Sequence, residues 1–227
     1  MSNKSPGQTM PSVETGRHLE AGASKSPTFV FAHGAGAGME SDFMEKVAEG
    51  MGALGVRVIR FEFPYMQIRR ALGSKRPPDR APKLLEHYKA ELKAIGGPLV
   101  IGGKSLGGRM ASMLVAQLRE EQDSSVDDIK GVVAFGYPFH PQGKPENLRT
   151  DHFENVSVPM LVLQGSRDKL GDRGLINGLA LPSNIDVRWL EDGDHDLKPR
   201  KVSGYTHDQH ISQAIKMASE FVKEKLC

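Results

Sequence analysis

The sequence predicts an α/β fold with a mainly parallel, doubly wound sheet and helices on both faces. Short apolar runs such as Thr28–Ala32 and Gly131–Gly136 are typical of strands covered on both sides. Stretches with the apolar spacing of helices lie between these runs, and this alternation favours parallel strands joined by crossover helices. The length of 227 residues fits one domain of this kind.

Composition narrows the class of protein. The net charge is +2 with 26% charged residues, so we expect no nucleic-acid partner. The one cysteine, Cys227, excludes an internal disulfide and favours a reducing compartment. No apolar stretch approaches the roughly 18 residues of a membrane span, and the first residues lack the apolar core of a signal peptide. We therefore expect a cytoplasmic protein without a membrane partner, whereas the oligomeric state is not predicted.

The start of the chain differs in composition from the rest. Residues 1–27 are rich in Ser, Gly, Pro and charge, so we expect a flexible N-terminal leader, with residues 12–15 as an optional edge strand. A single domain is expected over residues 28–227.

The expected elements follow one another regularly along this domain. Apolar runs and alternation predict strands at 28–32, 56–63, 99–101, 131–136, 158–163 and 185–190. Apolar residues at helical spacing predict helices at 41–54, at 81–95, after Ser105, through Leu175 and Leu179, and at 206–225. Residues 65–81, rich in Arg, Lys and Pro, are either a solvated connection or a flap over the functional site.

The stretch around Ser105 carries the clearest functional signal. The apolar run Leu99–Ile101 leads into Gly103-Lys104-Ser105-Leu106-Gly107, and a helical pattern follows at once. A G-x-S-x-G sequence between a strand and a helix describes a nucleophile elbow, which holds the serine hydroxyl at the end of the sheet. Gly103 and Gly107 remove side chains where this turn is crowded. The alternative is a Gly-rich packing turn without a chemical role.

An acid and a histidine follow two later strands. Asp168 comes after the strand at 158–163, and His195 comes after the strand at 185–190. Functional groups gather at the carboxyl ends of parallel strands, and the order Ser, acid, His is the one expected of α/β-hydrolases. Serine needs a base to remove its proton, imidazole titrates near neutral pH, and a carboxylate orients the ring. The sequence therefore predicts Ser105, Asp168 and His195 as catalytic residues.

Each assignment has a structural alternative. Asp168 can serve only as a helix cap, and His195 can be a solvated turn residue. Asp192, Asp194 and Asp196 compete with Asp168 as partners of the histidine. Asp192 and Asp194 are less suited to this role because they follow the same strand as His195.

Binding groups are also predicted. The backbone N–H groups of Ala35 and Leu106 are expected to form an oxyanion hole, one from the glycine-rich loop after the first strand and one from the start of the elbow helix. We expect substrate contacts from Tyr65, Met66, Lys104, Phe139 and His140. Basic residues near these positions suit an anionic substrate, with scattered solvated charges as the alternative.

Metal and cofactor sites are not expected. The histidines show no metal-ligand spacing with a carboxylate or cysteine cluster, and His33 beside the glycines favours a structural role. The Gly34-x-Gly36-x-Gly38 run is one residue short of the dinucleotide-binding G-x-G-x-x-G pattern, and no acidic residue ends a following strand.

Three motifs resemble the α/β-hydrolase superfamily: His33-Gly-Ala-Gly-Ala-Gly38, Gly103–Ser112 and Gln164-Gly-Ser-Arg-Asp168. Within it, they are similar to a small group related to dienelactone hydrolases and to the hydrolase-like subunit of a chromatin-associated acetyltransferase complex. The resemblance implies an α/β-hydrolase fold without a large cap domain and a triad of Ser105, Asp168 and His195. The chain has serine where dienelactone hydrolases use cysteine, which argues against their substrate.

Two functions follow as hypotheses. The first is a serine hydrolase that cleaves an ester or thioester of a small soluble substrate through an acyl-enzyme on Ser105. The alternative is a binding or scaffold protein that keeps the fold without using the site. Reaction with a serine-directed probe separates the two.

Overall fold

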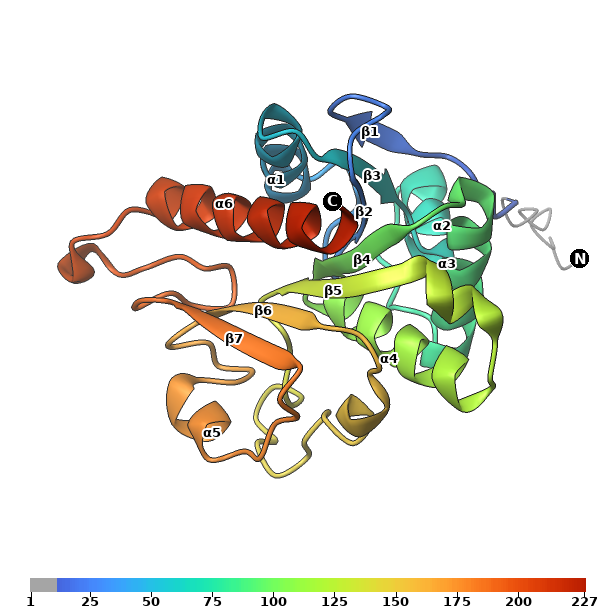
Figure 1. Ribbon diagram of the computed structural model, residues 1–227. Helices are drawn as coiled ribbons and strands as arrows, with labels where there is room; N and C mark the ends of the chain where they lie inside the picture. Colours follow the sequence, from blue (N-terminus) through green and yellow to red (C-terminus); the bar gives the residue numbers. More distant parts are fainter. Residues whose placement is uncertain (1–11) are drawn as a thin grey trace, which may run out of the picture.

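A seven-stranded sheet runs through the computed structural model, which describes residues 12–227 (Figure 1). The strand order is β1-β3-β2-β4-β5-β6-β7, and every neighbouring pair is parallel except β1 with β3. The strands are β1 (Leu19–Ala21), β2 (Thr28–Ala32), β3 (Arg57–Phe61), β4 (Leu99–Lys104), β5 (Ile129–Phe135), β6 (Met160–Gly165) and β7 (Ile185–Leu190). This arrangement confirms the predicted fold class.

Helices cover both faces of the sheet. One face carries α1 (Asp42–Ala53) and α6 (His207–Leu226), and the other carries α2 (Pro64–Leu72), α3 (Ala81–Ile95) and α4 (Leu106–Glu120) (Figure 1). The shorter elements are α5 (Arg173–Asn177) and the 3₁₀ segments η1 (Ser124–Asp128), η2 (Phe153–Asn155) and η3 (Lys201–Ser203).

Two apolar cores hold these layers together, one on each face of the sheet. In β2, Phe29 and Phe31 pack towards α1 and α6, whereas Val30 and Ala32 pack towards α3 and α4. All four side chains are fully buried, because a central parallel strand faces helices on both sides. The sheet is therefore a rigid support for the loops at its carboxyl edge.

Two segments differ from the sequence prediction. Strand β1 lies within the leader expected over residues 1–27, and residues 1–11 of that leader lie outside the described residues. The optional edge strand was expected at 12–15, but residues 19–21 pair with β3 instead. Helix α2 occupies much of the connection expected at 65–81. Pro64 is its first residue, a position where the missing proline N–H costs nothing, and Tyr65, Met66 and Ile68 anchor it in the core.

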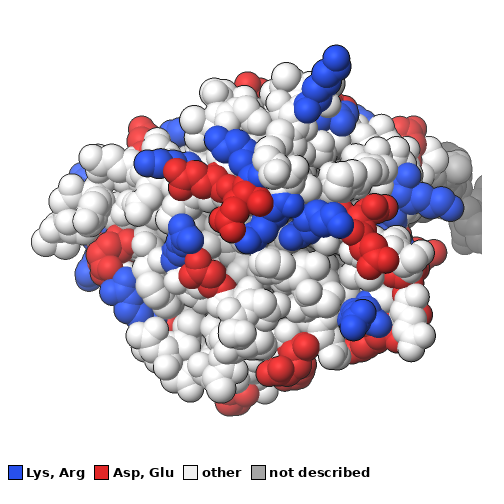
Figure 2. Space-filling model, in the orientation of Figure 1, with Lys and Arg blue, Asp and Glu red and all other residues white. Residues whose placement is uncertain are grey.

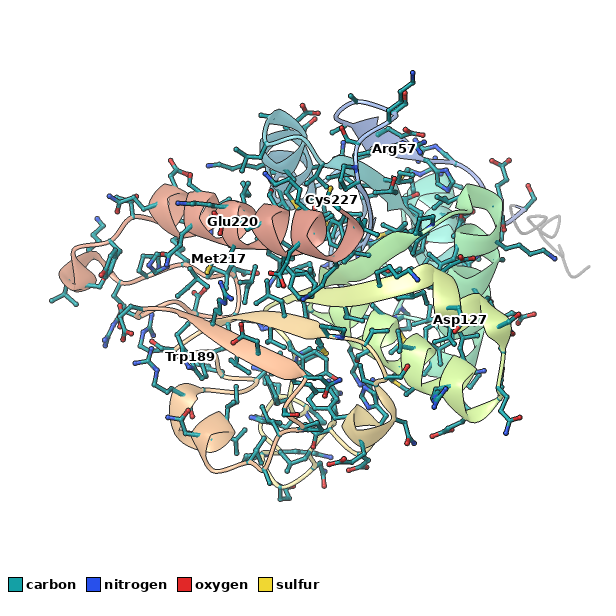
Figure 3. The ribbon with its side chains drawn as sticks, in the orientation of Figure 1. Arg57, Asp127, Trp189, Met217, Glu220 and Cys227 are labelled. Carbon is teal, nitrogen blue, oxygen red and sulfur yellow. The ribbon has the colours of Figure 1, made fainter. Side chains whose placement is uncertain are left out.

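Helix α6 has one side that packs against the core and one side that faces solvent. Met217 packs against the core, while Glu220 faces outwards (Figure 3). Basic and acidic side chains lie side by side on this face of the molecule (Figure 2). Along α6, Lys216 pairs with Glu220 and Lys225 pairs with Glu224. Within residues 12–227, none of the helices is both long and apolar enough to cross a membrane.

The strands end towards the left of Figure 1, where the long loop between β7 and α6 also lies. The loops after β2, β4, β6 and β7 meet at this edge, because parallel strands present their carboxyl ends together. The residues that the sequence singles out lie on these loops.

Candidate active site

Ser105 occupies a strained turn between β4 and α4. Its φ of 50° and ψ of −109° are uncommon for a residue with a side chain. A Cβ on Gly103 would lie 2.5 Å from the Ala32 carbonyl oxygen and from the Gly107 carbonyl carbon, and one on Gly107 would overlap Ala32 as well. The two glycines thus let the turn press against β2, as the elbow motif predicts.

Ser105, His195 and Asp168 form one hydrogen-bonded chain. The Ser105 Oγ lies 2.8 Å from His195 Nε2, and His195 Nδ1 lies 2.7 Å from Asp168 Oδ2. With Nδ1–H donating to the carboxylate, Nε2 is left as the acceptor for the serine hydroxyl proton. The structure therefore brings together the three side chains that lie 90 and 27 residues apart along the sequence.

The Asp168 carboxylate is fixed by a network of donors. It is fully buried; Oδ1 accepts from the Leu170 N–H at 2.8 Å, and Oδ2 accepts from Gln164 Nε2 at 2.9 Å as well as from His195. The Gln164 side chain is itself held by the backbone of Tyr137 and Gly171. A buried carboxylate needs such donors, and here they set its orientation towards the imidazole.

The competing acids are engaged elsewhere. Asp192 binds Arg200 and Arg167. Asp194 accepts from the backbone N–H groups of Asp196 and Lys198, each at 2.9 Å. Asp196 lies 3.2 Å from the Lys104 ammonium. Asp168 is thus the carboxylate that contacts the His195 ring within residues 12–227.

The glycine-rich loop after β2 is held by aromatic residues beneath it. The Tyr65 hydroxyl contacts the carbonyl oxygens of Gly34 at 3.1 Å and Ala35 at 3.2 Å. His33 Nδ1 donates to the Gly34 carbonyl at 2.7 Å, and His33 Nε2 accepts from the Phe63 N–H at 3.0 Å. Burial lowers the pKa of His33 to about 4, so this ring is neutral at neutral pH and serves the loop.

An open cleft of about 970 Å³ lies in front of Ser105. Its lining comes from the glycine-rich loop, the start of α1, the elbow and the histidine loop, and includes Ala35, Phe43, Lys104, Ser105, His195 and Ile211. Leu106 is the first residue of α4, where a backbone N–H has no acceptor within the helix. The cleft therefore combines a serine hydroxyl, an imidazole and the backbone of Ala35.

Four of the five predicted substrate contacts lie away from this cleft. Only Lys104 lines it. Tyr65 and Met66 point into the core beneath the glycine-rich loop, and Phe139 packs against Tyr137 and Phe153. His140 is nearly buried, with Nδ1 2.7 Å from the Pro141 carbonyl. Helix α2, which follows β3, and the loop that follows β5 pack onto the core, and the position of a residue after a strand does not predict this.

Two apolar residues of the cleft were not predicted as site residues. Phe43 packs against the core, as expected, and its ring also lies beneath the Lys104 ammonium, 5.4 Å from it. Ile211, on the first turns of α6, is buried against the sheet as expected and also lines the cleft. Both residues lie near the starts of helices that adjoin the carboxyl edge of the sheet. This position is the feature of the sequence that could have identified them as residues of the cleft.

The cleft carries balanced charge rather than the basic rim considered from the sequence. Lys46 pairs with Asp208, and Lys104 pairs with Asp196. Asp42 and Lys198 also line the cleft, one acidic and one basic. Burial lowers the pKa of Lys104, while the Asp196 carboxylate favours its charged form.

Comparison with known proteins agrees with this architecture. A family model described as an alpha/beta hydrolase domain matches residues 25–223. Est1E from Butyrivibrio proteoclasticus superposes with a TM-score of 0.66 at 15% identity, covering 92% of this chain and 93% of that one. A dienelactone hydrolase from Anabaena variabilis gives 0.66 at 18% identity, with coverage of 98% and 99%. An alpha-beta serine hydrolase homologue from Coxiella burnetii gives 0.57 at 15%, with coverage of 96% and 100%. At these identities the likeness concerns the fold.

Proposed function

Because the chain belongs to the alpha/beta hydrolase domain family, we propose that it is a serine hydrolase acting on an ester or thioester bond of a small molecule. The observation that carries this proposal is the hydrogen-bonded chain from Ser105 Oγ through the His195 ring to Asp168. A buried carboxylate, an imidazole and a hydroxyl in this order are the groups that acyl transfer requires.

The reaction begins with the attack of Ser105 on the substrate carbonyl. His195 Nε2 takes the hydroxyl proton as Oγ forms a bond to the carbonyl carbon. The oxygen of the tetrahedral intermediate becomes an anion, which the N–H groups of Ala35 and Leu106 stabilise. Asp168 holds the imidazole in orientation and stabilises its charged form.

Collapse of the intermediate breaks the bond to the alcohol or thiol, which leaves with the proton from His195. A water molecule then attacks the acyl-enzyme while His195 accepts its proton. The same oxyanion site stabilises the second intermediate, and the proton returns to Ser105 Oγ as the free acid departs. The substrate and one water molecule are consumed, and Ser105, His195 and Asp168 return to their starting states.

Features of the cleft support a compact substrate. Phe43 supplies apolar surface in the cleft, backed by the nearly buried side chains of Met44 and Ile211, and Ala35 and Ala37 place only methyl groups on the loop side. This surface suits a short or medium acyl group that contacts the start of α1, with the leaving group towards solvent.

A fluorophosphonate probe tests the proposal. The wild-type protein is expected to form one covalent adduct, located at Ser105 by mass spectrometry, and Ser105→Ala is expected to form none. Ser112→Ala is a matched control, because Ser112 lies on the same helix with its hydroxyl bonded to His152 and to the Arg109 carbonyl. Labelling of neither wild type nor Ser112→Ala, together with no turnover of acyl esters of graded length, would instead favour the scaffold function.

A further inference from the structure

Lys104 stands beside the proposed nucleophile, yet its ammonium is directed at the histidine loop. It is the last residue of β4, and its side chain is about 10% exposed. Its Nζ donates to the carbonyl oxygen of His195 and lies 3.2 Å from Asp196 Oδ1, over the Phe43 ring. Lys104, which immediately precedes Ser105, thus contacts the backbone of His195.

Gly136 provides the space in which this contact forms. It follows β5 with a φ of +67°, and a Cβ there would lie 2.6 Å from the His195 carbonyl oxygen and 3.1 Å from Lys104 Nζ. A side chain at this position would therefore separate the ammonium from the carbonyl. The end of β5 is shaped to admit the contact, because glycine both adopts the positive φ and leaves the space open.

The rest of the histidine loop is anchored on either side of His195. The Gly193 carbonyl accepts from the Arg167 N–H at 2.9 Å. After the histidine, His210 Nδ1 lies 2.9 Å from the Leu197 carbonyl, and His207 Nε2 lies 2.9 Å from the Asp196 carbonyl. At His195 itself, Lys104 supplies the contact to the backbone carbonyl.

The charge of Lys104 is balanced at the same place. A cation close to an imidazole opposes its protonation, which the proposed reaction requires. The Asp196 carboxylate lies against the ammonium and offsets this effect, so the lysine can hold the loop without opposing the imidazolium. The substrate-binding role that the sequence suggested for Lys104 is therefore not the one that its contacts favour.

We propose that Lys104 is a positioning residue, which places the His195 imidazole between Ser105 and Asp168 by holding the His195 carbonyl. The inference rests on the proposed hydrolase function, because it assigns the lysine a task in that reaction. A misplacement of a reacting group by about 1 Å can lower a rate by roughly a hundredfold. Loss of the contact should therefore affect the rate of acylation more than substrate binding.

The test compares Lys104→Met with the wild type by two readouts. The rate constant for fluorophosphonate labelling of Ser105 is expected to fall by roughly tenfold to a hundredfold. In ¹⁵N-histidine NMR spectra, the Nδ1–H signal of His195, assigned through its absence in His195→Gln, is expected to broaden or disappear as the ring leaves Asp168. Lys104→Arg retains a cationic donor and is expected to restore part of both.

Two further variants isolate the contact to the carbonyl. Asp196→Asn keeps the ammonium and is expected to retain the His195 signal, whereas Lys104→Met/Asp196→Asn removes both charges and is expected to lose it. This double variant also leaves no unpaired carboxylate. If Lys104→Met fails to fold, the double variant therefore tests whether the Lys104 contact positions the His195 ring. Lys46→Met removes a lysine from the same cleft that pairs with Asp208 and does not touch His195, so it should leave the signal unchanged.

The outcomes separate the two proposals. A wild-type His195 signal and labelling rate in folded Lys104→Met, or in the double variant, would overturn the positioning role. Absence of labelling in the wild type would count against the hydrolase function alone, because the NMR comparison still shows whether Lys104 places the ring.

Discussion

At the scale of single residues, the site depends on backbone positions that few side chains tolerate. Ser105 has a positive φ, and this conformation persists because β4, α4 and the neighbouring β2 leave it no alternative. The strain turns the hydroxyl out of the sheet towards His195. A flexible loop could carry the same three side chains but would not hold them at hydrogen-bonding distance.

Tyr65 is a second residue whose role comes from its contacts. Its hydroxyl holds the Gly34 carbonyl on the side of the loop away from the cleft. In a trans peptide the carbonyl and the following N–H point in opposite directions, so this contact turns the Ala35 N–H away from Tyr65. The residue expected to touch substrate therefore orients a proposed oxyanion donor.

We predict that Tyr65→Phe lowers kcat by roughly tenfold with little change in KM, because the loop loses the anchor of a donor that matters most in the transition state. Steady-state kinetics with the best ester from a substrate panel measure both constants. Tyr137→Phe is the matched control, since this buried hydroxyl binds the Arg149 carbonyl outside the cleft. Equal effects of the two substitutions would refute the assignment.

At the scale of elements, the segment before β2 is bound to the domain through α3. Glu91, which is 1% exposed, lies 2.7 Å from His18 Nε2 and 3.1 Å from His87 Nε2, and accepts from the Gly16 N–H. Burial acts to raise the pKa of Glu91, but hydrogen bonds from the two histidines and Gly16 outweigh it and lower the pKa. This carboxylate is the polar centre that fixes β1 beside β3.

We predict that Glu91→Ala lowers the free energy of unfolding by about 2–4 kcal/mol, because the His18 ring and the Gly16 N–H lose their partner and the buried His87 ring loses one of its two. Urea unfolding followed by circular dichroism measures the change. Glu86→Ala, on the exposed side of the same helix, should change it by less than about 0.5 kcal/mol. A similar small effect at Glu91 would show that the network does not hold the segment.

At the scale of the whole molecule, folding stability is coupled to pH through a buried imidazole. His33 is fully buried, and burial lowers its pKa from 6.5 to about 4. Above pH 6.5 the ring is neutral in both states and this contribution to stability is complete. As the pH falls from 6.5 to 4, the unfolded chain binds a proton that the folded protein excludes, so stability decreases.

We predict that this one group removes about 3 kcal/mol of unfolding free energy between pH 6.5 and 4, at about 1.4 kcal/mol for each pKa unit. His33→Gln keeps an acceptor for the Phe63 N–H but does not titrate, so its stability should depend less steeply on pH in this range. Urea unfolding at several pH values gives the slope, and His207→Gln is the control for loss of a histidine at the cleft. A mutant slope equal to that of the wild type would contradict the coupling.

Much of the fold was predictable because it depends on local patterns. The apolar runs within β2, β4 and β5 are typical of central parallel strands, and the capping box formed by Thr206 and Gln209 marks the start of α6. Helix α2 and strand β1 were harder to predict, because nine and three residues carry little periodic signal. Their positions depend on tertiary contacts, because α2 is fixed by its buried side chains and β1 by pairing with β3.

The sequence by itself determined the central strands, the longer helices and the order of Ser105, Asp168 and His195 along them. These follow from apolar periodicity and from glycines at a turn that excludes side chains, and both are properties of neighbouring residues. The tertiary structure decided which groups face the cleft: Phe43 and Ile211 rather than Tyr65 and Phe139, with Lys104 directed at the His195 carbonyl. The direction of a side chain depends on the space left by elements distant in sequence, so only the packed sheet and its loops could settle it.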